Sequence, residues 1–91
     1  MSPAEPGPRR LSLRLHAMLE DAAGASRVEV ELPPDDATPA SAFEAAISIH
    51  PGLAEWRGVV AFAVDTRMLP PRTPISPEVR TLDALPPVSG G

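Results

Sequence analysis

The sequence contains no cysteine and no lysine. Without cysteine, the chain has no disulfide framework, no thiolate metal site and no thiol nucleophile. If the protein handles sulfur, that sulfur cannot be carried on a cysteine side chain. Without lysine, the chain offers no side-chain amine for an isopeptide bond, so it cannot build lysine-linked chains on itself. All 8 basic residues are therefore arginines.

The chain is also short, has no cluster of basic residues and has no long apolar run. A length of 91 residues allows one small domain and leaves no room for a two-domain enzyme with an enclosed cleft. The net charge is −4 and the arginines are scattered, so nucleic acid is not an expected partner. The longest apolar run, Val59–Val64, is far shorter than the roughly 20 residues that span a bilayer, and the N-terminus lacks an apolar signal core. We therefore expect a cytoplasmic protein without a membrane partner.

The N-terminal part predicts a leader followed by two strands. Residues 1–10 are rich in proline and poor in apolar side chains, so we expect a disordered leader. A domain over 11–85 follows. Apolar and polar residues alternate over 11–16 and again over 27–32, with the period of strands that bury one face. We expect these strands to pair antiparallel across a short helical turn over 17–23.

The middle of the chain predicts one main helix. Thr38 is a suitable N-cap and Pro39 suits the first helical position. Phe43, Ala46 and Ile47 then share one helical face. The helix should end near His50, because the proline that follows disfavours helical geometry there.

The remaining elements are strands. A short turn with Leu53 and Trp56 precedes Val59–Val64, whose unbroken apolar character is typical of a strand buried on both faces. A proline-rich loop with a very short edge strand at 68–69 leads to a last strand over 79–85. The order indicates an α+β domain in which one main helix packs on one face of a mixed sheet of about five strands.

The chain ends in Pro-Pro-Val-Ser-Gly-Gly over 86–91. The two prolines favour an extended stalk, and two residues without side chains can enter a narrow channel. The carboxylate of Gly91 is thus the candidate reactive group. An α-carboxyl has a pKa of about 3.3 to 3.7, so at neutral pH it is an anion that must be activated before it reacts. Leu85 is a candidate contact at the channel mouth, although it would serve equally well as a cap on the core.

This element order and the tail Pro86-Pro87-Val88-Ser89-Gly90-Gly91 resemble the ubiquitin-like β-grasp sulfur carriers. The tail is similar in particular to that of the MoaD type, the small subunit of molybdopterin synthase. The resemblance covers residues 11–91, and the tail is its specific part.

The resemblance implies a carrier that is not an enzyme alone. An adenylating E1-like enzyme of the MoeB type would couple Gly91 to AMP with ATP, and a sulfur donor would convert the adenylate into a thiocarboxylate. The large synthase subunit, of the MoaE type, would receive the tail and pass the sulfur to a pterin precursor. Leu85 would contact this subunit at the mouth of its channel. The residues that thread into the channel would be Pro86, Pro87, Val88, Ser89 and Gly90. The chain lacks a Gly-rich phosphate loop, so ATP should bind the partner and this chain should bind no cofactor.

The sequence departs from the family pattern next to the tail. Ala84-Leu85 stands where an aromatic pair is common, and Asp83 lies within the last strand. Glu78 begins the segment where a Gly-Asp turn is frequent, and Glu20 replaces an arginine of the first helical turn. Because these residues lie where a partner could dock, the identity of the partner stays open.

Four alternatives to the molybdenum-pathway carrier remain. They are a thiamine-type carrier, a modifier conjugated through Gly91, a non-covalent adaptor and an incidental frayed terminus.

Other candidate sites are weak. His16 and His50 have no second ligand at a metal-like spacing, so we expect structural or surface histidines and no metal. Asp35 and Asp36 suit the start of a helix better than an acid/base pair. Phe43 and Trp56 are expected in the core.

Overall fold

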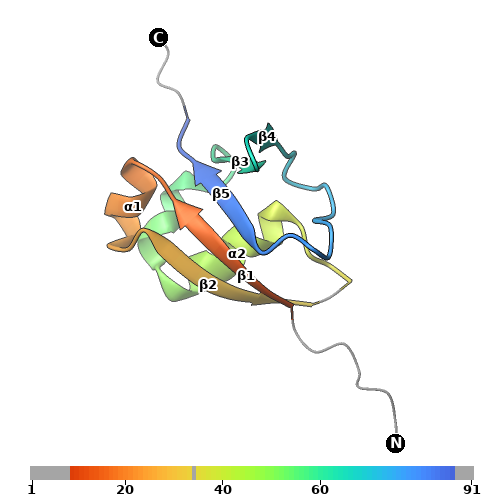
Figure 1. Cartoon of the computed structure of the whole chain (residues 1–91). Coiled ribbons are helices and arrows are strands. Elements are labelled where there is room, and N and C mark those ends of the chain that lie inside the picture. The colour runs from red at the N-terminus through yellow and green to blue at the C-terminus, as the bar shows by residue number, and fades with distance from the viewer. Residues whose placement is uncertain (1–8, 34, 88–91) are drawn as a thin grey trace, which may run out of the picture.

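A computed structural model describes residues 9–33 and 35–87. These residues form a five-stranded sheet, two α-helices and one 3-10 helix (Figure 1). In chain order the elements are β1 (Arg9–Leu15), α1 (Met18–Ala23), β2 (Arg27–Leu32), α2 (Pro39–Ile49), η1 (Pro51–Trp56), β3 (Ala61–Val64), β4 (Arg67–Met68) and β5 (Thr81–Leu85). No helix within these ranges has the length and hydropathy needed to cross a membrane.

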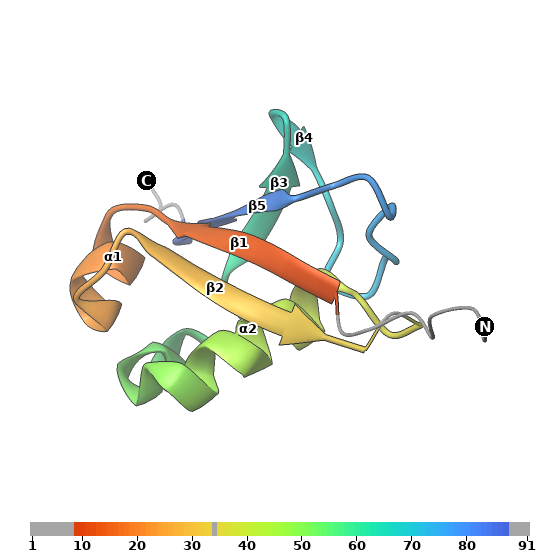
Figure 2. The same ribbon diagram turned by 60° about the horizontal axis from the view of Figure 1, so that its bottom comes forward.

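The strands lie side by side in the order β2-β1-β5-β3-β4. β1 and β5 run parallel, while the β1–β2, β3–β5 and β3–β4 pairs are antiparallel. Figure 2 shows α2 lying beneath β1 and β2 on one face of the sheet. This arrangement is the ubiquitin-like β-grasp fold, which confirms the predicted fold class.

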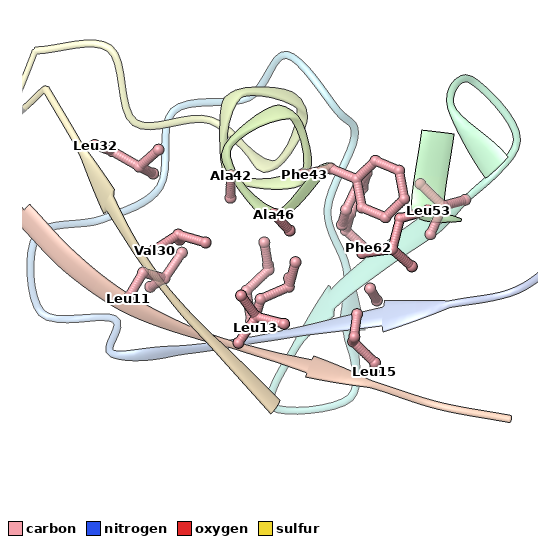
Figure 3. Packing of buried hydrophobic residues seen from close by; sticks show 14 of the residues in the cluster. Leu11, Leu13, Leu15, Val30, Leu32, Ala42, Phe43, Ala46, Leu53 and Phe62 are labelled. Atoms are coloured by element: carbon pink, nitrogen blue, oxygen red, sulfur yellow. The ribbon is translucent and has the colours of Figure 1, made fainter. Parts of the chain in front are cut away.

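The core lies between α2 and the sheet, and the alternation of the first two strands builds it (Figure 3). Leu11, Leu13 and Leu15 of β1 are buried, as are the matching apolar residues of β2. Each such side chain contributes about 1.5 to 3 kcal/mol when it leaves water. Phe43 of α2 packs edge-on against Phe62 of β3, with ring centroids 6.0 Å apart.

The start of α2 is as predicted. Thr38 caps the helix by accepting a 3.1 Å hydrogen bond from the Ser41 amide. Ser41 completes a capping box, because its hydroxyl accepts a 2.9 Å bond from the Thr38 amide. Pro39 occupies the first turn, where its missing N–H costs nothing. The helix ends at Ile49, and His50 follows as its C-cap.

The structure corrects the predicted leader. β1 begins at Arg9, two residues before the expected domain start at Leu11, and Arg9 lies opposite Leu32 in the ladder with β2. Its side chain is also held, because the guanidinium donates to the carbonyls of Ile75 and Val79, both at 2.7 Å. The last two residues of the predicted 1–10 leader therefore belong to the sheet. The other eight lie outside the described residues.

The strands of the second half are shorter or shifted relative to prediction. β3 begins at Ala61, because Val59 is 52% exposed in a turn that follows Gly58, whose φ is 85°. β4 lies one residue earlier than the predicted 68–69 strand. β5 begins at Thr81, because the amide of Val79 turns back to bond the carbonyl of Ser76 at 3.0 Å.

A close contact joins α1 to η1. The last turn of α1 ends at Gly24, which has a φ of 73° and bonds the carbonyl of Glu20. A Cβ on Gly52 would lie only 2.7 Å from the carbonyl oxygen of Ala22, so a residue without a side chain is required there. Beyond it, Leu53 is fully buried and Trp56 packs against the core.

Candidate functional site

The candidate site begins where β5 passes into the tail. β5 lies between β1 and β3, so both of its edges are hydrogen-bonded. Leu85 and Pro86 are half-buried and Pro87 is exposed. The predicted site residues Val88, Ser89, Gly90 and Gly91 lie outside the described residues, so their roles stay predictions. The fold thus leads a firmly held strand directly into the Pro-Pro segment (Figure 1).

Leu85 lies on the sheet face opposite α2. Leu82 and Ala84 point into the core and are fully buried, so the alternation of β5 turns Leu85 to the other side. There it pairs with Ala61 of β3. Leu85 therefore does not cap the core, and its docking role stays a prediction.

A short apolar strip continues from Leu85 across the same face. Ala63 of β3 pairs with Met68 of β4, whose surface is 63% exposed. This strip, made of Leu85, Ala61, Ala63 and Met68, lies beside the origin of the tail.

A polar cluster lies next to the strip. The Asp83 carboxylate contacts His16 Nε2 at 3.0 Å and Arg14 Nε at 3.6 Å through the same oxygen. All three side chains are partly exposed. The sequence predicted an isolated structural or surface histidine at position 16, so this cluster was not predicted. Only the parallel pairing of β1 with β5, which aligns Arg14 with Asp83, brings the residues together.

The other polar candidates lie outside this cluster. His50 is the C-cap of α2. Asp35 and Asp36 are exposed ahead of that helix. Within the described part of the chain, no three His, Cys, Asp or Glu side chains converge as a metal site would require.

A salt bridge borders an apolar hollow on the helical side. Arg57 donates two hydrogen bonds to the Glu44 carboxylate, at 2.6 and 2.9 Å. These bonds hold the pKa of Glu44 below its ordinary value, and the charge of Arg57 acts in the same direction. The hollow beside the pair has a volume of about 190 Å³, and Phe43 and Phe62 are among its lining residues.

A more open hollow lies at the opposite end of β5. Its volume is about 440 Å³, and it is bordered by the β3–β4 hairpin and by the loop over 74–79. Asp65, Arg67 and Glu78 are its charged lining residues. Because Asp65 follows β3, which runs antiparallel to β5, this hollow lies away from the end of β5 that leads to Pro86.

Comparison with known proteins supports the fold. The sequence matches no protein-family model and no curated protein. Among solved structures, small archaeal modifier protein 1 from Haloferax volcanii is 24% identical with a TM-score of 0.74, over 90% of this chain and 99% of that one. The same modifier from Methanosarcina acetivorans is 16% identical with a TM-score of 0.73, over 94% of this chain and 100% of that one.

A third similar structure belongs to a Pyrococcus furiosus protein that is provisionally assigned as molybdopterin converting factor, subunit 1. It is 20% identical with a TM-score of 0.70, over 88% of this chain and 99% of that one. At these identities the likeness shows the fold. The neighbours are small ubiquitin-like proteins of the carrier and modifier type.

Proposed function

We propose that this protein is a sulfur carrier of molybdenum cofactor biosynthesis, with the carboxylate of Gly91 as its reactive group. The observation that carries the proposal is the position of β5. This strand is held on both edges and leads without an intervening turn into Pro86 and Pro87. A likeness in fold to the Pyrococcus furiosus protein that is provisionally assigned as a molybdopterin converting factor subunit supports it.

The chemistry begins with activation. The Gly91 carboxylate attacks the α-phosphate of ATP on an adenylating E1-like enzyme, which forms an acyl-adenylate and releases pyrophosphate. A sulfur donor at the oxidation level of sulfide then attacks the acyl carbon, and AMP leaves. The product is a Gly91 thiocarboxylate, formed without a change of redox state. ATP binds the enzyme, and the reaction takes place in the cytoplasm, where ATP is supplied.

The second stage is transfer. The tail enters the large molybdopterin synthase subunit, where the thiocarboxylate gives its sulfur to a pterin precursor. Ordering six tail residues costs roughly 1 to 2 kcal/mol each, which contacts with the partner must offset. Pro86 and Pro87 lower that cost, because their φ angles are already restricted in the free chain. Leu85 contacts the partner at the entrance.

Intact-protein mass spectrometry of the chain isolated from its native cell tests this proposal. We expect a fraction whose mass has increased by the difference between sulfur and oxygen, mapped to Gly91. A variant that carries one additional C-terminal alanine is the control, because its Gly91 has no free carboxylate. A chain found only in unmodified form under conditions of active cofactor synthesis contradicts the carrier function.

A protein modifier is the second candidate, and the likeness to two small archaeal modifier proteins favours it. In that case the activated Gly91 forms an isopeptide bond with lysines of target proteins. The same mass analysis separates the candidates, because a modifier yields branched Gly-Gly remnants on target lysines. Deleting Gly91 should remove those conjugates.

A further inference from the structure

Three charged side chains form a row across the sheet face that α2 leaves uncovered. Arg14 of β1 is aligned with Arg27 of β2 on one side and with Asp83 of β5 on the other. Directly opposed residues point to the same face of a sheet. Two arginines therefore stand next to each other, with a single carboxylate at one end of the row.

The opposed arginines are an exception on this face. Elsewhere in the β1–β2 ladder, Arg10 lies opposite Glu31 with 3.4 Å between their charged atoms, and Ser12 bonds Glu29 at 2.5 Å. Like charges in direct opposition destabilise a sheet. The Asp83 carboxylate balances the positive charge of Arg14 but not that of Arg27, and it also contacts His16. Of the ion pairs formed by the described residues, none includes Arg27.

The two arginines border a hollow of about 320 Å³ at this end of the sheet. Its lining residues are Arg14, Leu15, His16, Glu20, Ser26 and Arg27. Glu20 is the one acidic residue among them, and it forms no ion pair with either arginine in the described structure. The lining thus carries two positive charges and one negative charge.

The hollow and the start of the tail at Pro86 lie at the same end of the sheet. β1 and β5 run parallel (Figure 1). Leu15, which borders the hollow, is aligned with Ala84, two positions before Pro86. A protein that takes up the tail therefore approaches this hollow as well.

We infer that the hollow receives an acidic side chain of the adenylating enzyme that takes up the tail, an inference that rests on the proposed function. A carboxylate placed between Arg14 and Arg27 relieves their repulsion and forms charge-assisted hydrogen bonds. The docking surface of that enzyme is accordingly acidic where it faces Arg14 and Arg27, and apolar where it faces Leu85. Charge complementarity of this kind sets partner choice and is weakened by salt.

Kinetics with the adenylating enzyme from the same cell test this inference. ATP–pyrophosphate exchange is measured against the concentration of the full-length chain for wild type, Arg27→Glu and Arg72→Glu. Arg72 is the matched control, because it is an exposed arginine outside the row. We expect Arg27→Glu to raise KM roughly three- to tenfold with kcat nearly unchanged, and Arg72→Glu to have no effect. Arg27→Lys should restore most of the lost affinity.

Folding does not confound the result, because Arg27→Glu replaces a like-charge pair with an opposite-charge pair beside Arg14. We expect its melting temperature to equal or exceed that of wild type. Added salt should raise the KM of wild type toward that of Arg27→Glu. An unchanged KM for Arg27→Glu, or an equal rise for Arg72→Glu, overturns the inference while the carrier function stands. A wild-type chain that supports no exchange and acquires no sulfur at Gly91 overturns the proposed function instead.

Discussion

The guanidinium of Arg9 donates a 2.7 Å hydrogen bond to the main-chain carbonyl of Ile75, 66 positions further along the chain. It also bonds the carbonyls of Ser76 and Val79. One side chain at the start of β1 thus holds the loop that precedes β5. The parallel pairing of β1 with β5 depends on the path of this loop.

Replacing Arg9 should therefore cost stability. We expect Arg9→Met to lower the free energy of unfolding by about 1 to 3 kcal/mol, because carbonyls that accepted charged hydrogen bonds lose their donor. Chemical denaturation provides the measurement. Arg10→Met is the control, since the Arg10 side chain is 79% exposed and pairs with the exposed Glu31. Equal losses in the two variants would show that the loop is held by other contacts.

Gly52→Ala should destabilise the junction of α1 and η1. The added Cβ would lie 2.7 Å from the Ala22 carbonyl oxygen, so one of the two elements must shift. A loss of roughly 1 to 3 kcal/mol is typical of such overpacking. Thermal unfolding of Gly52→Ala beside Glu55→Ala, an exposed site in the same 3-10 helix, measures it. A melting temperature equal to that of wild type would contradict the close contact.

Thr66→Gly should stabilise the β3–β4 hairpin. Asp65 and Thr66 form its turn with φ angles of 50° and 67°, and positive φ is unfavourable for a β-branched residue. Relief of that conformation should outweigh the extra freedom of glycine in the unfolded chain, for a net gain of about 0.5 to 1 kcal/mol. Denaturant titration of Thr66→Gly and wild type shows whether the free energy of unfolding rises or falls. Thr73→Gly, in a loop position without positive φ, should show no gain.

The Glu44–Arg57 bridge should make a small, pH-dependent contribution to stability. Because the pKa of Glu44 is lowered in the folded chain, the contribution is complete above the unfolded-state pKa, near 4.5, and is lost as the pH falls through the folded-state value. The difference in unfolding free energy between wild type and Glu44→Gln should thus be constant from pH 7 to about 5 and shrink in more acidic solution. Solvent screening keeps it small. Glu55→Gln serves as the control, and a difference that grows on acidification would contradict the sign.

Much of the fold could be predicted from local patterns. Leu11, Leu13 and Leu15 alternate because one face of β1 is buried, and Thr38 with Pro39 starts α2 through hydrogen bonds within a few residues. Such signals need no knowledge of distant partners. The boundaries of β3 and β5 were less accurate, because the turns at 57–59 and 76–79 compete with strand pairing.

The contacts around the tail origin could not be predicted in the same way. His16 and Asp83 are 67 positions apart, and only the register of β1 against β5 brings them to 3.0 Å. The opposition of Arg14 and Arg27 likewise depends on the β1–β2 register. The side chain of Arg9, at the start of β1, bonds the loop that precedes β5, and the sequence alone does not place that loop beside it.

The inner position of β5 has a mechanical consequence. A pull on the tail acts along a strand whose two edges are bonded to β1 and β3. A force along β5 loads the bonds of both ladders in shear, whereas a strand at the edge of the sheet, pulled in the same direction, would be held by one ladder. A force that enters the domain at Leu85 is therefore resisted by two ladders at once.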